Sequence, residues 1–197
     1  MEQQTIIFLG PQGSGKGTQV ELLQEFLKEG GKREVLYLEV GAALREFGAQ
    51  PGPTQEMVGA SMKRGELQPG FISGYLAAKF FIENLHLDSH LLVDGFPRNE
   101  ENWMTLVSAM SFYKRTPTLV YLNISDEEAV KRLLLRKRSD DTVEGIQKRL
   151  AWSRGQALPI IEHFRAQSEY RILEIDGERS VEEIHQDIVT QLGLLKK

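Results

Sequence analysis

Five short runs of apolar, β-favouring residues divide the chain, and longer stretches with helical spacing separate them. The runs lie at residues 5–9, 35–38, 91–93, 118–122 and 172–175. A short continuous apolar run is typical of a strand that is buried on both faces, as in a parallel sheet. Between positions 22 and 27 apolar residues recur at helical spacing, and Gly30 and Gly31 end that helix. The pattern therefore predicts an α/β fold with a five-stranded parallel sheet.

Capping signals and breakers refine this outline. Three capping-box pairs mark helix starts: Ser125 with Glu128, Asp141 with Glu144, and Ser180 with Glu183. The segment 48–70 contains three prolines and five glycines. We expect looser structure there, inserted into the sheet scaffold.

Composition narrows the class of protein. A chain of 197 residues with 41% hydrophobic and 26% charged residues is typical of one soluble globular domain. It has no cysteine, which excludes disulfides, thiolate catalysis and cysteine zinc sites. The four histidines show no convincing metal-binding pattern.

Charge and hydropathy limit which partners the protein can bind and where in the cell we expect it. The net charge of −4 argues against a nucleic-acid partner, because such binding depends on cationic neutralisation of phosphates. No apolar run is long enough to span a membrane, and residues 1–4 do not resemble the start of a signal peptide. We therefore expect a cytoplasmic protein that binds neither nucleic acid nor membrane.

A phosphate-binding loop follows the first apolar run. Residues 10–16, GPQGSGK, fit the pattern G-x-x-x-x-G-K between a strand and a helix start. Glycines in such a loop let backbone N–H groups converge on phosphates, while Lys16 reaches the β- and γ-phosphates. A chance glycine-rich turn is the alternative, and the flanking strand and helix argue against it. The residue after Lys16 is Gly17 rather than Ser or Thr, so Thr18 supplies the next hydroxyl for Mg²⁺ or phosphate.

A carboxylate and a group of arginines complete the candidate chemistry. Asp94 ends the third run, where phosphate-loop proteins often hold Mg²⁺ through water, although a helix cap is the alternative. Phosphoryl transfer needs positioning and charge neutralisation, so arginines should surround the site. Five arginines lie in one stretch of the sequence: Arg132, Arg136, Arg138, Arg149 and Arg154. The alternative interpretation is that they form a solvated basic face.

Three motifs together resemble the adenylate kinase family, which includes the UMP/CMP kinases. They are residues 13–19 (GSGKGTQ), 94–98 (DGFPR) and 138–141 (RSDD), and the likeness spans almost the whole chain. The resemblance implies one three-layer P-loop kinase domain over 1–197 with strand order 2-3-1-4-5. It also implies an NMP-binding insert at 39–68 and a short lid at 136–144 without zinc.

The same resemblance implies the site residues. The ATP site would comprise Gly13, Ser14, Gly15, Lys16, Gly17, Thr18, Arg132, Arg136 and Arg179. The NMP site would comprise Val40, Gly41, Arg45, Glu66, Leu67, Gln68, Gly95, Arg98, Asn102, Arg138 and Arg149. The catalytic cations would be Lys16, Arg98, Arg136, Arg138 and Arg149, with Mg²⁺ held by Asp94 through water and by Thr18.

The expected activity is reversible phosphoryl transfer from Mg·ATP to a nucleoside monophosphate, by a monomer that needs no general base. AMP is the expected acceptor. UMP or CMP is the alternative, because Val40 replaces the usual Thr of adenylate kinases and Asn102 replaces the usual Gln. Asn102 could instead be an exposed helix residue, and Arg179 could be a surface arginine rather than a contact of the ATP base. Rival functions are a nucleotide-operated switch and a P-loop kinase acting on a small metabolite.

Overall fold

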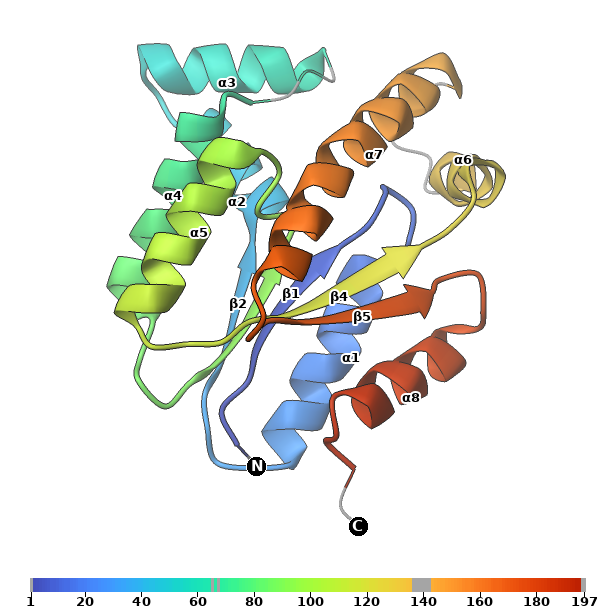
Figure 1. Cartoon of the computed structure of the whole chain (residues 1–197). Coiled ribbons are helices and arrows are strands. Elements are labelled where there is room, and N and C mark those ends of the chain that lie inside the picture. Colours follow the sequence, from blue (N-terminus) through green and yellow to red (C-terminus); the bar gives the residue numbers. More distant parts are fainter. Residues whose placement is uncertain (1, 65, 67, 136–142, 196–197) are drawn as a thin grey trace.

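A five-stranded parallel sheet forms the centre of the computed structural model, which describes residues 2–64, 66, 68–135 and 143–195 (Figure 1). The strands lie in the order β2-β3-β1-β4-β5, so the expected topology is confirmed. Their bounds are β1 Thr5–Leu9, β2 Val35–Glu39, β3 His90–Asp94, β4 Thr118–Asn123 and β5 Arg171–Asp176. In a parallel sheet the carboxyl ends of the strands meet at one edge, which is where ligands bind.

Helices cover both faces of the sheet and give the three layers. They are α1 Lys16–Glu29, α2 Val40–Gly48, α3 Pro53–Lys63, α4 Gly70–Asn84, α5 Glu100–Phe112, α6 Asp126–Leu135, α7 Val143–Ala166 and α8 Val181–Gln191. Alternate residues of β1 serve the two layers, because successive side chains of a strand point to opposite faces. Ile7 packs with residues of α4, α5 and α7, whereas Ile6 and Phe8 pack with residues of α1 and α8.

The segment 48–70 corrects our expectation of loose structure. It contains α3, which begins at Pro53, and proline is well accommodated in the first turn of a helix. Two of its glycines are packing residues: a Cβ on Gly59 would lie 2.7 Å from the carbonyl oxygen of Gly48. Glycine is needed there because α2 and α3 approach closely.

Of the three predicted capping boxes, one is complete in the structure and one is partial. Ser180 and Glu183 form the complete capping box of α8, as expected. Ser125 Oγ accepts a hydrogen bond from the Glu128 N–H at 3.3 Å, but the Ser125 N–H donates to Glu178 instead. Asp141 lies outside the described residues.

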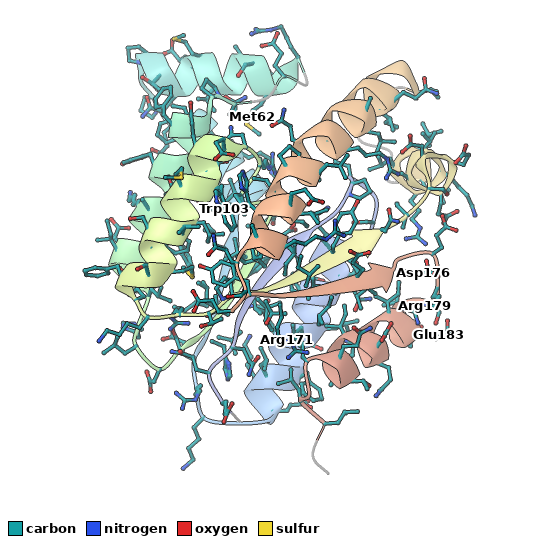
Figure 2. The ribbon with its side chains drawn as sticks, in the orientation of Figure 1. Met62, Trp103, Arg171, Asp176, Arg179 and Glu183 are labelled. Carbon is teal, nitrogen blue, oxygen red and sulfur yellow. The ribbon has the colours of Figure 1, made fainter. Side chains whose placement is uncertain are left out.

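Aromatic packing joins α5 to α7. Trp103 of α5 lies beneath α7 (Figure 2), where its ring stacks on His163 with centroids 5.2 Å apart and touches Phe164 at 5.0 Å. No helix in the described part of the chain is long and apolar enough to cross a membrane.

Candidate active site

The phosphate loop joins β1 to α1 at the carboxyl edge of the sheet. Gly10, Gly13 and Gly15 all have positive φ, which side-chain-bearing residues rarely adopt. A Cβ on Gly10 would also lie 2.3 Å from the Leu122 carbonyl oxygen. Gly15 precedes α1 and no side chain caps that helix. The first N–H groups of α1 therefore remain available for an anion, and the helix dipole favours one there.

Lys16 places its charge over this loop. Its Nζ donates to the carbonyl oxygens of Gly10 at 2.9 Å and Pro11 at 3.0 Å, and it lies 3.5 Å from Ser14 Oγ. The ammonium group thus turns back over the loop rather than out into solvent. Gly17 and Thr18 follow in the first turn of α1, and a Cβ on Gly17 would meet no atom within 4 Å.

Asp94 ends β3, the strand that lies between β1 and β2. Its Oδ1 is buried and has no hydrogen-bond partner among the described residues. Burial raises the pKa of Asp94, while the charges of Lys16 and Arg98 oppose that shift. The helix-cap interpretation is wrong, because Asn99 is the residue that caps α5. A buried carboxylate oxygen without a partner, near a phosphate loop, suits a hydrated Mg²⁺ ion.

The two arginines expected to bind the acceptor lie near each other, because a Cβ on Gly41 would be 3.4 Å from Arg45 Nη1 and 3.8 Å from Arg98 Nη2. Arg45 of α2 donates from Nη2 to Glu39 Oε1 at 2.9 Å. Arg98 donates from Nε to the Gly95 carbonyl oxygen at 2.6 Å, and no described residue accepts from its Nη atoms. Burial lowers the pKa of Arg98, and the charge of Asp94 opposes that shift. The pair provides guanidinium donors for an anion.

Two expected base-contacting side chains are buried instead. Val40 belongs to the hydrophobic core, with no exposed surface. Asn102 is also fully buried, and its Oδ1 accepts hydrogen bonds from Ser73 Oγ at 3.1 Å and from the Arg98 N–H at 3.3 Å. Both interpretations of Asn102 therefore need correction: it is not exposed, and its amide is already occupied by the protein.

The ATP-side arginines are held by neighbouring elements. Arg132 bonds Glu128 Oε1 at 2.7 Å and the Gly177 carbonyl oxygen at 2.9 Å. Gly177 lies beside the phosphate loop, because a Cβ there would be 3.4 Å from the Ser14 carbonyl oxygen. Arg132 thus stands near the expected ATP site.

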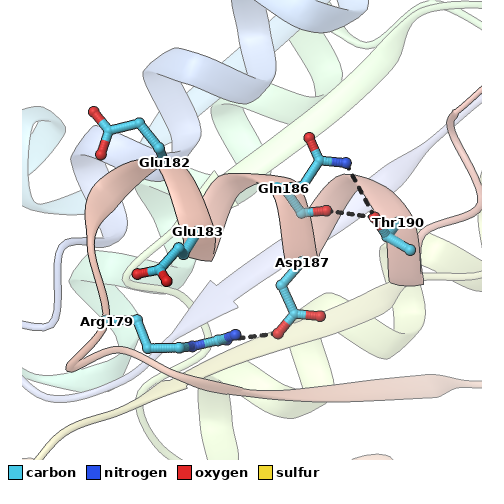
Figure 3. A pocket seen from close by; sticks show the side chains of 6 residues that line it. All are labelled: Arg179, Glu182, Glu183, Gln186, Asp187 and Thr190. Atoms are coloured by element: carbon cyan, nitrogen blue, oxygen red, sulfur yellow. Dashed lines mark hydrogen bonds and ion pairs between the residues drawn. The ribbon is translucent and has the colours of Figure 1, made fainter.

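Arg179 lies in the turn between β5 and α8, two residues after Gly177. Its Nη2 contacts Asp187 Oδ2 at 2.5 Å, and the side chain lines a shallow pocket on α8 (Figure 3). Figure 2 shows it at the turn between β5 and α8, near Asp176 and Glu183. Asp187 of α8 engages its guanidinium in this structure, and the expected contact of Arg179 with ATP stays a prediction.

The remaining predicted residues are less informative. Glu66 is exposed and pairs with Arg64 at 2.7 Å, and Gln68 Nε2 donates to Ser61 Oγ at 2.8 Å. Arg154 bonds Asp126 and the Ile124 carbonyl oxygen, which attaches α7 to the start of α6. Three expected residues, and one side chain, fall outside the described part of the structure: Leu67, Arg136, Arg138 and the side chain of Arg149.

Glu39 is a charged residue near the site that was not among the predicted site residues. It ends β2, pairs in register with Asp94 and contacts Arg45. A charged residue directly after the apolar run 35–38 was the available signal, since Asp94 has the same placement after its own run. Within the described residues, no group of three or more His, Asp or Glu could hold a metal ion on protein ligands alone.

Several known proteins are similar to this chain over nearly its whole length. The family model described as adenylate kinase matches residues 8–169. The adenylate kinase of Prochlorococcus marinus (strain MIT 9301) is 35% identical over 192 residues, covering 95% of this chain and 98% of the relative. UMP-CMP kinase 3 of Oryza sativa subsp. japonica is 32% identical over 188 residues, covering 93% and 83%. With its phosphate loop, strand-end carboxylate and guanidinium pair, the chain therefore belongs to the adenylate kinase family and is a nucleoside monophosphate kinase.

Proposed function

We propose that this enzyme transfers the terminal phosphoryl group of Mg·ATP reversibly to AMP. The observation that carries the proposal is the position of Asp94. It lies close enough to both Lys16 and Arg98 for their charges to oppose the rise in its pKa. Lys16 belongs to the loop suited to the ATP phosphates, and Arg98 belongs to the guanidinium pair suited to the acceptor phosphate. A site with cations on both sides of one carboxylate can bring two phosphate groups together despite their repulsion.

The chain's own groups have distinct roles in this proposal. The N–H groups of the phosphate loop and Lys16 bind the ATP phosphates, while Arg45 and Arg98 orient the acceptor phosphate for in-line attack. Asp94 and Thr18 would hold Mg²⁺, which neutralises charge on the ATP phosphates when bound. No general base is required, because the acceptor phosphate is already an anion.

Two regions would complete the site. We assign acceptor binding to the insert 39–68, which contains α2 and α3, and closure over ATP to the short lid 136–144. Arg136, Arg138 and Arg149 would clamp the phosphates when the lid is drawn shut and water is excluded. We also propose that the enzyme is a monomer and needs no zinc; its elution volume and its activity after zinc chelation test these two points.

Burial of two side chains removes the sequence argument for a pyrimidine acceptor, and AMP remains the expected acceptor. The sequence argument for UMP or CMP depended on Val40 and Asn102 reading the base. Both side chains are fully buried, so neither presents a group to a base. Most of the relatives are named adenylate kinases, including Adenylate kinase 1 of Nostoc sp. (strain PCC 7120), and one is named a UMP-CMP kinase.

A panel of acceptors tests the proposal. We would measure kcat/KM for AMP, UMP, CMP, GMP and dAMP at one saturating Mg·ATP concentration. AMP should exceed the next ribonucleotide by about tenfold or more, as expected when a site hydrogen-bonds one base edge. A preference for UMP or CMP would replace adenylate kinase by UMP/CMP kinase, and no diphosphate from any acceptor would end the kinase proposal.

Substitution of Lys16 tests the role of the loop. Lys16→Met should lower kcat by roughly 100-fold or more, the loss typical of removing one transition-state donor. Lys28→Met is the matched control, because Lys28 is exposed in the last turn of the same helix. It should leave kcat unchanged.

A further inference from the structure

Glu39 is a negative charge among the cations assigned to the acceptor. Its Oε1 accepts a hydrogen bond from Arg45 Nη2 at 2.9 Å. Both side chains are partly exposed, Arg45 at 52% and Glu39 at 39%, so solvent and solutes reach the pair. The contact is therefore one that an incoming anion can replace.

Three charged groups converge above the backbone of Gly41. A Cβ at this glycine would lie 3.4 Å from Arg45 Nη1, 3.5 Å from Glu39 Oε1 and 3.8 Å from Arg98 Nη2. Arg45 is engaged by Glu39, whereas the Nη atoms of Arg98 have no acceptor among the described residues. The Glu39 carboxylate thus occupies part of the space that a phosphate bridging both arginines would need.

Glu39 also lies in the field of Asp94. The two residues are register partners on adjacent strands, and the charge of Glu39 contributes to the raised pKa of Asp94. Like charges so close repel one another, which destabilises Glu39 in its present position. A phosphate dianion carries more charge and more acceptor oxygens than a carboxylate, so it should be the stronger partner of the two guanidiniums.

We propose that Glu39 is an internal competitor for the acceptor phosphate. In the free enzyme it holds Arg45, and the acceptor must displace it to reach both arginines. This proposal rests on the proposed kinase function. Its consequence is a raised KM for the acceptor, with no effect on the ATP site.

The substitution Glu39→Gln tests this role. Glutamine keeps the size of the side chain but removes its charge, so the acceptor phosphate no longer displaces an ion pair. We expect the KM for AMP to fall about two- to fivefold, the range for a partly exposed ion pair. The KM for ATP should not change and kcat should not fall. A purely structural role would not produce this separation of KM from kcat.

Glu174→Gln is the matched control. Glu174 forms a comparable exposed ion pair with Arg165 at 2.6 Å on β5, outside the residues assigned to either nucleotide. It should leave both KM values unchanged. Thermal unfolding of both variants establishes that each is folded before the kinetics are compared.

A binding titration gives an independent readout. AMP alone, added to the enzyme without ATP, should bind Glu39→Gln more tightly than wild type by the same two- to fivefold factor. An unchanged or raised KM and Kd for AMP in the folded variant would overturn the proposal, and would show instead that Glu39 holds Arg45 ready for the acceptor. If wild type phosphorylates no nucleoside monophosphate, the proposed function itself fails, which the acceptor panel detects separately.

Discussion

The side-chain amide of Asn102 donates a hydrogen bond to the Gly70 carbonyl oxygen, 2.9 Å away, and so joins the first turn of α5 to the start of α4. The same amide accepts from the backbone N–H of Arg98. One buried side chain therefore connects α4 and α5 with the loop that carries Arg98, one of the two arginines assigned to the acceptor phosphate. These two hydrogen bonds, and not any reach toward a base, explain its role.

Removing that amide should destabilise the protein. Asn102→Ala leaves the Gly70 carbonyl and the Arg98 N–H without their buried partner, which costs about 1–3 kcal/mol. Asn102→Gln adds a methylene to a fully packed position and should cost about 1–3 kcal/mol as well. Urea unfolding measures both. Asn123→Ala, at an exposed strand end, is the control and should lie near wild type.

The acceptor ranking provides the contrasting outcome. If Asn102→Gln is as stable as wild type and changes the order of AMP, UMP and CMP in the kinetic panel, then Asn102 reads the base after all. A loss of stability with an unchanged ranking is what the hydrogen bonds predict.

Neutralising Asp94 should separate stability from activity. Asp94→Asn should lower kcat/KM by about 10- to 100-fold and weaken the Mg²⁺ dependence, as for residues that act on a metal through water. The nucleotide-free variant should be at least as stable as wild type at pH 7, because a buried charge is removed. A variant that is much less stable than wild type, or equally active, would contradict this account.

The pH dependence follows from the sign of the Asp94 shift. A carboxyl with a raised pKa keeps its proton in the folded state to a higher pH than in the unfolded state. The contribution of Asp94 to the free energy of unfolding therefore falls as pH rises from its ordinary pKa of 3.8 toward the raised pKa of the folded state. The difference between wild type and Asp94→Asn in unfolding free energy should show that decline across this range.

Gly15 of the phosphate loop and Gly17 of the first turn of α1 allow a direct comparison of backbone strain. A Cβ on Gly15 or on Gly17 would meet no atom within 4 Å, but only Gly15 has positive φ. Gly15→Ala should therefore cost about 1–2 kcal/mol, the penalty of left-handed backbone for a residue with a side chain. Gly17→Ala should be neutral or stabilising by up to about 1 kcal/mol, since alanine favours helix. Equal effects in chemical denaturation would refute the distinction.

His90 should make stability fall at mildly acidic pH. It is fully buried, and its Nδ1 accepts a hydrogen bond from the Gln4 N–H at 3.0 Å, so it is neutral in the folded protein. Burial lowers its pKa, and the charges of Arg33, the N-terminus and Arg115 add to the shift. As pH falls below the ordinary value of 6.5, the unfolded chain gains a proton that the folded chain does not, and the unfolding free energy decreases.

His90→Asn keeps an acceptor near the Nδ1 position but does not titrate. The slope of unfolding free energy against pH below 6.5 should therefore be shallower than in wild type. Burial also lowers the pKa of His185, so replacing both histidines should flatten the slope further. Parallel slopes in wild type and the double variant would disprove the assignment.

Local rules were enough to predict the scaffold. The apolar runs predicted all five strands, because a strand buried on both faces needs apolar residues throughout. The phosphate loop was predictable because its glycines must adopt positive φ at a strand-to-helix turn. Asp94 was predictable for a different reason. The carboxyl ends of the strands in a parallel sheet share one edge, so a residue that ends a strand lies at that edge.

Contacts between distant segments were decided only by packing. Gly48 and Gly59 resembled loop breakers in the sequence, but α2 and α3 approach closely there. Asn102 was expected to contact the acceptor base or to be exposed, but it is buried and bonds the start of α4. Arg179 turned toward Asp187, and Glu39 met Arg45. Periodicity reports which face of an element is buried, but not which neighbour covers it. A polar side chain takes its role from that neighbour's free donors and acceptors, which exist only once the elements have packed.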